Sequence, residues 1–190
     1  YDVDVVIDAT GRFLKRDELS AHLDSGAKRV FISRNAKDTI DRYVIPGINE
    51  STIKSSDQII STTSSTTQVL ALMVKMLDES FGLKRAMMTT VHAYTADQPL
   101  ADAAGVDLRR SRSAVENIIP NTTKAPSIVE DIMPQFSGKL DGIAFNVPVP
   151  NGSCVDLTTE LKNIPSVDEA NDAIKKFSEG SLKGIIGYTE

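Results

Sequence analysis

The segment Gln58-Ile59-Ile60-Ser61-Thr62-Thr63-Ser64-Ser65-Thr66-Thr67 leads from a short run that ends at Ser61 into six further hydroxyl-bearing residues, 62–67. Residues 58–61 are typical of a brief buried strand. From residue 66 to residue 81 apolar side chains recur at helical spacing, and Gly82 is suited to end that helix. The segment therefore predicts a strand, a tight loop and a helix. We place a domain boundary here, between residues 62 and 63.

Upstream of this segment, short apolar runs alternate with one helical stretch. Residues 3–7, 29–33 and 43–45 are typical of buried strands, and residues 16–23 of a short helix. A strand, a helix and a further strand at this spacing predict a parallel α/β unit.

Downstream, the predicted strands are longer. They cover residues 85–94, 142–149 and 153–161, and helices are predicted at 127–133 and 167–178. Longer strands joined by long connections indicate a sheet that carries helices on one face. The whole chain is therefore predicted to be an α/β (α+β) protein.

Composition excludes several classes of protein. The 190 residues are 41% hydrophobic and 25% charged, with a net charge of −5, which disfavours a nucleic-acid partner. No apolar run approaches the length of a membrane span, so we expect no membrane partner. The single cysteine, Cys154, precludes a disulfide within this sequence and fits a reducing compartment, so we expect a cytoplasmic protein.

The hydroxyl-rich start of the central helix allows two interpretations. Backbone N–H groups in the first turn of a helix are unpaired and favour an anion, a thiolate or a developing oxyanion. Alternatively, the stretch is only a well-capped helix start, for which Ser64 or Ser65 is suited. Local sequence leaves both open.

Wider comparison of motifs points to a family. STTSSTTQVL, from Ser61 onward, resembles the Ser-Asn-Ala-Ser-Cys-Thr-Thr-Asn pattern around the nucleophile of glyceraldehyde-3-phosphate dehydrogenases. Further motifs follow the order and spacing of that family: ATGRF, MTTVHAYTADQ, DLRRSRSA, ENIIPNTTKAP, GKLDGIAFNVPVPNGSCVDLT and EGSLKGIIGYTE. The resemblance implies that residues 1–62 end a Rossmann NAD-binding domain. Residues 63–190 would then form most of a catalytic domain with a mixed, largely antiparallel sheet covered by helices.

The resemblance also implies an activity. Members of the family are glycolytic oxidoreductases that use NAD and inorganic phosphate to oxidise a phosphorylated aldehyde, and they assemble as homotetramers. A cysteine thiolate attacks the aldehyde, and a histidine lowers the thiolate pKa and acts as the base. Ser65 occupies the position of that nucleophile, and His92 occupies that of the histidine.

Other positions match the binding residues of the family. The substrate phosphate would be held by Thr95 and Asp97, and inorganic phosphate by Ser64, Thr66, Arg110 and Thr123. The nicotinamide side of NAD would lie against Thr10 and Gly11. Without the resemblance, Thr10 and Gly11 indicate a simple turn, His92 a hydrogen-bonded histidine at a strand end, and Arg110 a solvated loop or a subunit contact.

The sequence departs from the family at its most reactive positions. Ser65 replaces the cysteine, and a hydroxyl is not a standing anion beside a histidine. Asn146 replaces an arginine expected at the substrate phosphate, and loss of such a charge-assisted contact costs about 1.5–3 kcal/mol. Lys124 replaces a glycine beside the second phosphate site, while Thr62 and Gln68 replace two asparagines. We therefore expect reduced or absent dehydrogenase activity.

The ends of the sequence and the remaining alternatives bear on function as well. No GxGxxG motif is present, so we expect the pyrophosphate-binding segment to precede Tyr1, further strands to follow Glu190, and no tight NAD binding by these residues alone. The alternatives are an inactive homologue with a binding or assembly role, and an erythrose-4-phosphate dehydrogenase. A third, hydrolysis by Ser65 and His92, lacks a GxSxG motif.

Overall fold

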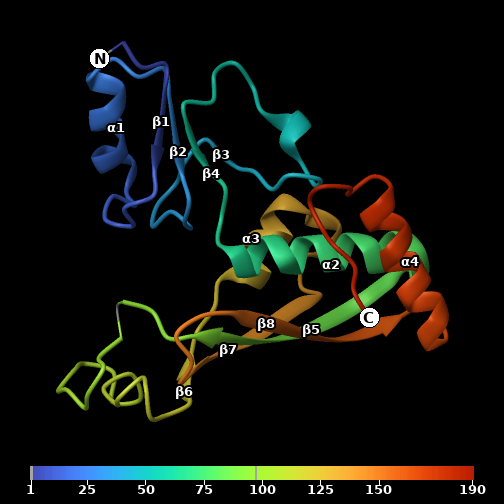
Figure 1. Ribbon diagram of the computed structural model, residues 1–190. Coiled ribbons are helices and arrows are strands. Elements are labelled where there is room, and N and C mark those ends of the chain that lie inside the picture. Colours follow the sequence, from blue (N-terminus) through green and yellow to red (C-terminus); the bar gives the residue numbers. More distant parts are fainter. Residues whose placement is uncertain (1, 97) are drawn as a thin grey trace. The chain divides into compact units, whose positions relative to one another are not determined.

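A computed structural model describes residues 2–96 and 98–190, and these form two compact units (Figure 1). Of the described residues, 2–81 and 163–190 form the first unit, and 82–96 and 98–162 form the second. Each contains a four-stranded sheet, one parallel and one mixed. The predicted α/β fold class is therefore confirmed. The domain boundary between residues 62 and 63 stays a prediction.

The first unit is built on a parallel sheet in the order β1-β2-β4-β3. Its strands are β1 (Val5–Asp8), β2 (Arg29–Ile32), β3 (Arg42–Tyr43) and β4 (Ile59–Ser61). Helix α1 (Arg16–Asp24) makes the crossover from β1 to β2, because parallel neighbours need a long connection.

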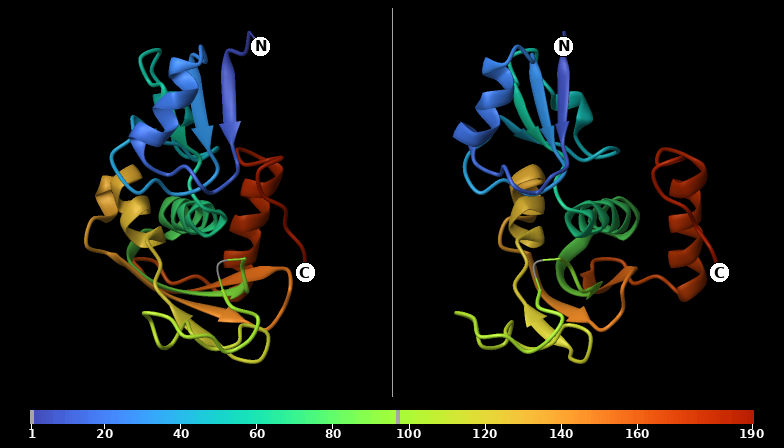
Figure 2. Two further views of the ribbon diagram at one scale, coloured as in Figure 1. Left: turned by 90° about the vertical axis from the view of Figure 1, so that its left-hand side faces the viewer. Right: turned by 60° about the vertical axis from the view of Figure 1, so that its left-hand side comes forward.

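Helix α1 covers one face of this sheet (Figure 2). Leu19 of α1 is fully buried against Val30, Ile32 and Ile59 of the strands. Burial of an aliphatic side chain of this size stabilises the fold by about 1.5–3 kcal/mol, so this small cluster accounts for the packing of α1.

A carboxylate, Asp41, holds the start of β4. Its Oδ2 accepts the backbone N–H groups of Gln58 and Ile59, both at 2.8 Å, and its Oδ1 accepts from Arg16 at 2.8 Å. Burial raises the pKa of Asp41, but the two backbone hydrogen bonds and the Arg16 guanidinium outweigh it, and the pKa lies below the ordinary 3.8. The ionised carboxylate thus ties α1 to β4 across the sheet.

Two longer helices complete the first unit. Helix α2 (Ser65–Phe81) packs against α4 (Val167–Glu179), while the 3-10 helix η1 (Glu50–Thr52) lies in the loop before β4. The apolar cluster of this part contains Leu72, Met76 and Leu182, with Ile48, Met73, Ile174, Phe177 and Ile186 around them. Gly82 follows α2 at a φ of +71°, as expected of a residue that ends a helix.

The second unit is built on a mixed sheet in the order β6-β7-β5-β8. Its strands are β5 (Leu83–Ala93), β6 (Ile119–Asn121), β7 (Leu140–Val147) and β8 (Ser153–Leu161). β5 pairs parallel with β7 and antiparallel with β8, and β6 pairs antiparallel with β7. Helix α3 (Ala125–Ile132) packs on β7 (Figure 1), and the 3-10 helix η2 (Pro134–Phe136) follows it.

Two of the strands depart most from the prediction. The predicted strand at residues 43–45 ends instead at Tyr43, because the Asn49 side chain accepts the N–H of Ile45 at 2.8 Å and draws the chain into a turn. Strand β6 was not predicted, since three residues with Pro120 in the middle carry no strand pattern. Across residues 2–96 and 98–190, none of the helices combines the length and apolar character that crossing a bilayer demands.

Replacement of Asp41 by alanine tests this account of the first unit. We expect Asp41→Ala to lower the free energy of unfolding by about 1–3 kcal/mol at pH 7, because two backbone amides lose their acceptor. Chemical denaturation measures the difference, with exposed Asp2→Ala as the matched control. Since the folded pKa of Asp41 lies below its unfolded value, its contribution is complete above that unfolded value and is lost as the pH falls through the folded one. Equal stability of the two variants at pH 7 would contradict the assignment.

Candidate functional site

The loop between β4 and α2 contains a strained residue. Thr63 is 1% exposed and has a φ of +65°, a region that β-branched residues rarely adopt. Its N–H donates to the Ser61 hydroxyl at 2.9 Å, and that hydroxyl donates to the Arg34 carbonyl at 2.7 Å. Ser61 therefore holds the turn in place from within the sheet.

Two amide side chains brace the same loop from either side. Asn35 accepts the N–H of Ser64 at 3.1 Å, and Gln68 Nε2 donates to the carbonyl of Thr62 at 2.7 Å. Thr62 and Gln68 are the two positions where the sequence departs from the asparagines of the resembled pattern. Here they contact each other, so these departures form part of the brace.

Ser64, and not Ser65, caps helix α2. Its hydroxyl accepts the N–H of Thr67 at 3.3 Å and lies 2.8 Å from the Thr67 hydroxyl. Ser65 is the first residue of α2 and is exposed, and its hydroxyl has no hydrogen bond to any of the residues that the structure describes. The exposed hydroxyl of Ser65 is therefore presented in the first turn of α2, where backbone N–H groups carry partial positive charge, and Thr66 follows it.

His92 lies near the end of β5 in the second unit. Its Nδ1 is 2.7 Å from the carbonyl oxygen of Ala93. Because a carbonyl only accepts, Nδ1 carries the proton in this contact. In the neutral ring Nε2 therefore keeps its lone pair, which is the arrangement that a general base requires.

Asn146 stands beside His92 in the register of β5 and β7. It is 6% exposed, donates from Nδ2 to the same Ala93 carbonyl at 3.0 Å, and accepts at Oδ1 from Asn121 at 3.0 Å. The structure thus joins His92 and Asn146 through one backbone oxygen. Sequence reasoning missed Asn121 and this connection, because a backbone carbonyl leaves no signal in a motif.

The remaining predicted residues of the second unit lie in loops and at the start of α3. Thr95 donates its N–H to Gln98 at 2.9 Å, and Asp97 lies outside the described residues. The Thr123 hydroxyl accepts the N–H of Ala125 at 3.1 Å, and Lys124 immediately precedes α3. Both residues therefore help to start that helix.

Arg110 lies close to Asn121. Both line a small cavity of about 160 Å³, together with Asp107, Arg109, Pro120 and Thr122. The loop that contains Arg109 and Arg110 is therefore folded against β6. Arg110 therefore lies near Asn121, whose side chain bonds to Asn146, which in turn bonds to the Ala93 carbonyl beside His92.

Thr10 and Gly11 form the turn after β1. The Thr10 hydroxyl and N–H both donate to Asp8 Oδ1, at 2.7 and 2.9 Å. Burial raises the pKa of Asp8, but these bonds and His22 outweigh it, so the pKa lies below the ordinary value. Gly11 has a φ of +68°, and a Cβ there would lie 2.8 Å from Arg34, which explains the need for glycine.

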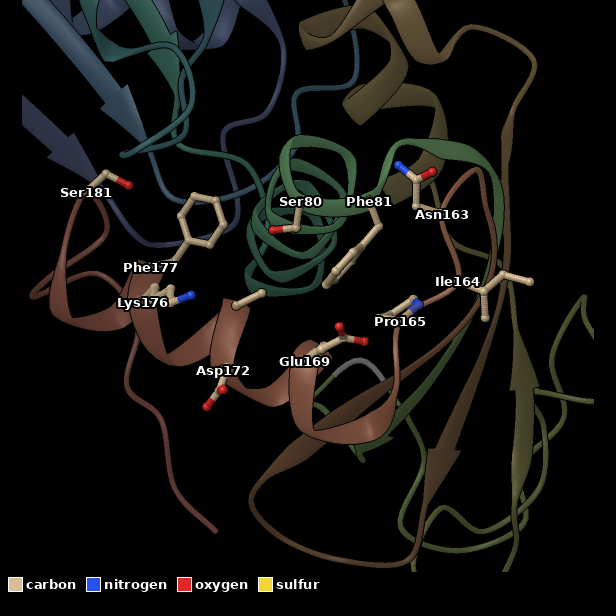
Figure 3. Close-up of a pocket in the computed structure, with 11 residues that line it drawn as sticks. Ser80, Phe81, Asn163, Ile164, Pro165, Glu169, Asp172, Lys176, Phe177 and Ser181 are labelled. Carbon is tan, nitrogen blue, oxygen red and sulfur yellow. The ribbon is translucent and has the colours of Figure 1, made fainter.

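One cavity of the first unit lies away from these residues. A cavity of about 620 Å³ lies between the end of α2 and α4 (Figure 3), with Phe81, Phe177, Glu169 and Lys176 among its lining residues. None of the predicted site residues lines it. Within the described part of the chain, no group of three or more His, Cys, Asp or Glu residues is arranged to hold a metal ion.

Removal of the Ser61 hydroxyl tests the brace on Thr63. We expect Ser61→Ala to lower the free energy of unfolding by about 1–3 kcal/mol, since the buried Thr63 N–H and Arg34 carbonyl each lose a partner. Exposed Ser56→Ala is the control, with a change within about 0.5 kcal/mol. Thermal and urea unfolding report both values, and a Ser61→Ala protein as stable as the control would argue against the brace.

Comparison with known proteins agrees with this arrangement of motifs. Residues 64–190 match the glyceraldehyde 3-phosphate dehydrogenase C-terminal domain. A glyceraldehyde-3-phosphate dehydrogenase of Mycobacterium tuberculosis (strain H37Rv) is 48% identical over 186 residues, covering 98% of this chain and 55% of the relative. Those of Geobacillus stearothermophilus and Streptomyces coelicolor are 47% and 48% identical, covering 99% of this chain and 56% of each relative. The chain thus spans about half the length of these curated relatives. It belongs to the glyceraldehyde-3-phosphate dehydrogenase family.

Proposed function

We propose that this chain is part of an NAD-dependent, phosphorylating glyceraldehyde-3-phosphate dehydrogenase of glycolysis whose activity is impaired or absent. The observation that carries the proposal is Ser65. Its exposed hydroxyl is presented at the first turn of α2, within a braced loop, where the pattern of the family has a cysteine. The surroundings suit a nucleophile, while the nucleophile itself is changed.

The chemical consequence follows from acidity. A thiol at a helix N-terminus beside a histidine is readily deprotonated, and the thiolate attacks a carbonyl carbon. The Ser65 hydroxyl has to lose its proton as it attacks, which needs base help at the same moment. An oxygen ester formed on Ser65 would also transfer its acyl group to phosphate less readily than a thioester.

His92 is the proposed base. Its Nε2 lone pair would take the proton from the hydroxyl of the bound adduct as the carbon is oxidised. NAD, when bound, would supply the hydride acceptor. Thr10 and Gly11 fit its nicotinamide side, because they lie at the carboxyl end of β1, the edge where open α/β sheets bind dinucleotides.

Two sets of residues are proposed for the phosphates. Inorganic phosphate would be bound by Ser64, Thr66, Arg110 and Thr123, with Lys124 adding a cation. The substrate phosphate would be bound by Thr95 and Asp97, with Asn146 in place of an arginine. Hydrogen bonds from Asn146 carry no charge, so we infer weaker binding of the phosphorylated aldehyde than with a guanidinium.

A second candidate function is assembly without catalysis, as a homotetramer in the cytoplasm. The observation that favours it is a pair of exposed apolar side chains on one face of the second sheet. Met87 of β5 and Ile143 of β7 remain 38% and 42% exposed, although both lie in the middle of paired strands. Sedimentation velocity measures the oligomeric state, and a monomer would argue against this role. Erythrose 4-phosphate as the substrate, or hydrolysis by Ser65 and His92, are weaker alternatives that a substrate panel distinguishes.

Restoration of the thiol tests the proposal. We expect Ser65→Cys in the full-length protein to produce NADH from glyceraldehyde 3-phosphate, NAD and phosphate at a rate at least about tenfold above the unmodified protein. Val69→Cys is the matched control, because it places a thiol on the same helix, exposed and one turn further along. Both variants are made with Cys154→Ser, so that each carries one thiol within these 190 residues.

The reactivity of the thiol gives a second measurement on the same proteins. The Ser65→Cys protein should react with iodoacetamide at a lower pH than the Val69→Cys protein, since backbone N–H groups at the start of α2 stabilise a thiolate. Robust NADH formation by the unmodified protein would overturn the proposed impairment. An inactive Ser65→Cys protein with a reactive thiol would favour the assembly role.

A further inference from the structure

Asn146 departs from the family pattern and is also deeply buried. Its Nδ2 donates to the carbonyl oxygen of Ala93 at 3.0 Å, and His92 Nδ1 lies 2.7 Å from the same oxygen. A carbonyl oxygen has two lone pairs, so the two donors share its capacity. The position expected to carry a phosphate-binding charge is here connected to the ring of the proposed base.

The connection has a fixed direction. The N–H of Thr122 donates to Asn121 Oδ1 at 2.9 Å, which turns Nδ2 of Asn121 toward Asn146 Oδ1, at 3.0 Å. Asn146 must then present Nδ2 to the Ala93 carbonyl. Because the chain begins at a backbone donor, each amide has one allowed orientation. The series ends on the Ala93 carbonyl, and His92 can form a hydrogen bond to that oxygen only when its Nδ1 carries the proton.

We propose that Asn146 is a positioning residue for His92. With Asn121 it holds the Ala93 carbonyl so that the neutral imidazole keeps its proton on Nδ1 and its lone pair on Nε2. The inference deepens the proposed function, on which it rests for the role of His92 as base. It also assigns Asn146 a task other than contact with the substrate phosphate. The asparagine that weakens phosphate recognition would thereby keep the base in its reactive form.

Nitrogen-15 NMR of the full chain labelled at histidine tests this directly, because the two ring nitrogens of a neutral imidazole resonate far apart according to which carries the proton. The 190 residues contain two histidines, His22 and His92, and the spectrum of His92→Gln identifies the signals of His92. In the unmodified protein we expect the Nδ1-protonated tautomer to dominate. In Asn146→Leu we expect the ratio of the tautomers to shift toward Nε2–H by about threefold to tenfold.

The matched control is Asn117→Leu, which removes a similar side-chain donor, from Asn117 Nδ2 to the Ser113 carbonyl at 2.9 Å, without touching His92. It should leave the ratio of His92 tautomers unchanged. If Asn146→Leu does not fold, Asn121→Ala decides, since it keeps the Asn146 donor but frees its orientation, and we expect a smaller shift in the same direction.

Two results would overturn the inference. One is an unmodified protein in which His92 is protonated mainly on Nε2. The other is a tautomer ratio in the folded Asn146→Leu protein, or in its Asn121→Ala substitute, equal to that of Asn117→Leu. Because the spectra need no substrate or turnover, they stay informative if the dehydrogenase proposal fails.

Discussion

The backbone of Thr63, turned to a φ of +65° while its side chain is buried, sets the path of the chain from β4 into α2. For a β-branched residue this conformation costs about 1–2 kcal/mol. The cost is offset by bonds from outside the turn: Ser61 accepts the Thr63 N–H, and Asn35 accepts that of Ser64. The position of α2 follows from this turn at Thr63. With Ser64 used as the cap, the next hydroxyl, on Ser65, stands at the first turn of the helix without a partner among the described residues.

The second unit also fixes a residue of the proposed site, but through side-chain amides and not through a strained turn. A series of amide side chains from β6 and β7 fixes one carbonyl at the end of β5, and that carbonyl orients His92. In both units the residues around the reactive positions are held by hydrogen bonds that close on backbone groups. The departures from the family pattern therefore differ in kind. Gln68 and Asn146 are built into these networks, whereas Ser65 stands where we propose that the reacting atom is changed.

Much of the fold was predictable from local pattern. The strand Ser153–Leu161 was predicted with its observed bounds, because polar and apolar side chains alternate along it, and α2 was placed within one residue because its apolar face repeats over four turns. Prediction failed where a side chain or a strand outside the local sequence pattern determines the structure. The strand at Tyr43 ends because the Asn49 side chain accepts the N–H of Ile45, and β6 exists only because β7 pairs with it. The roles of Asn121 and Asn146 depend on a backbone oxygen of another strand, which no motif records.

We propose that Ser65 lies at a site suited to a nucleophile but does not itself form the covalent intermediate at an appreciable rate. Mass spectrometry of the unmodified full-length protein, mixed with glyceraldehyde 3-phosphate and NAD without inorganic phosphate, tests this most directly. Without phosphate an acyl group on residue 65 has no acceptor other than water and accumulates where it forms. We expect an unchanged mass for the peptide that contains Ser65. An acyl ester on the Ser65 hydroxyl would contradict it.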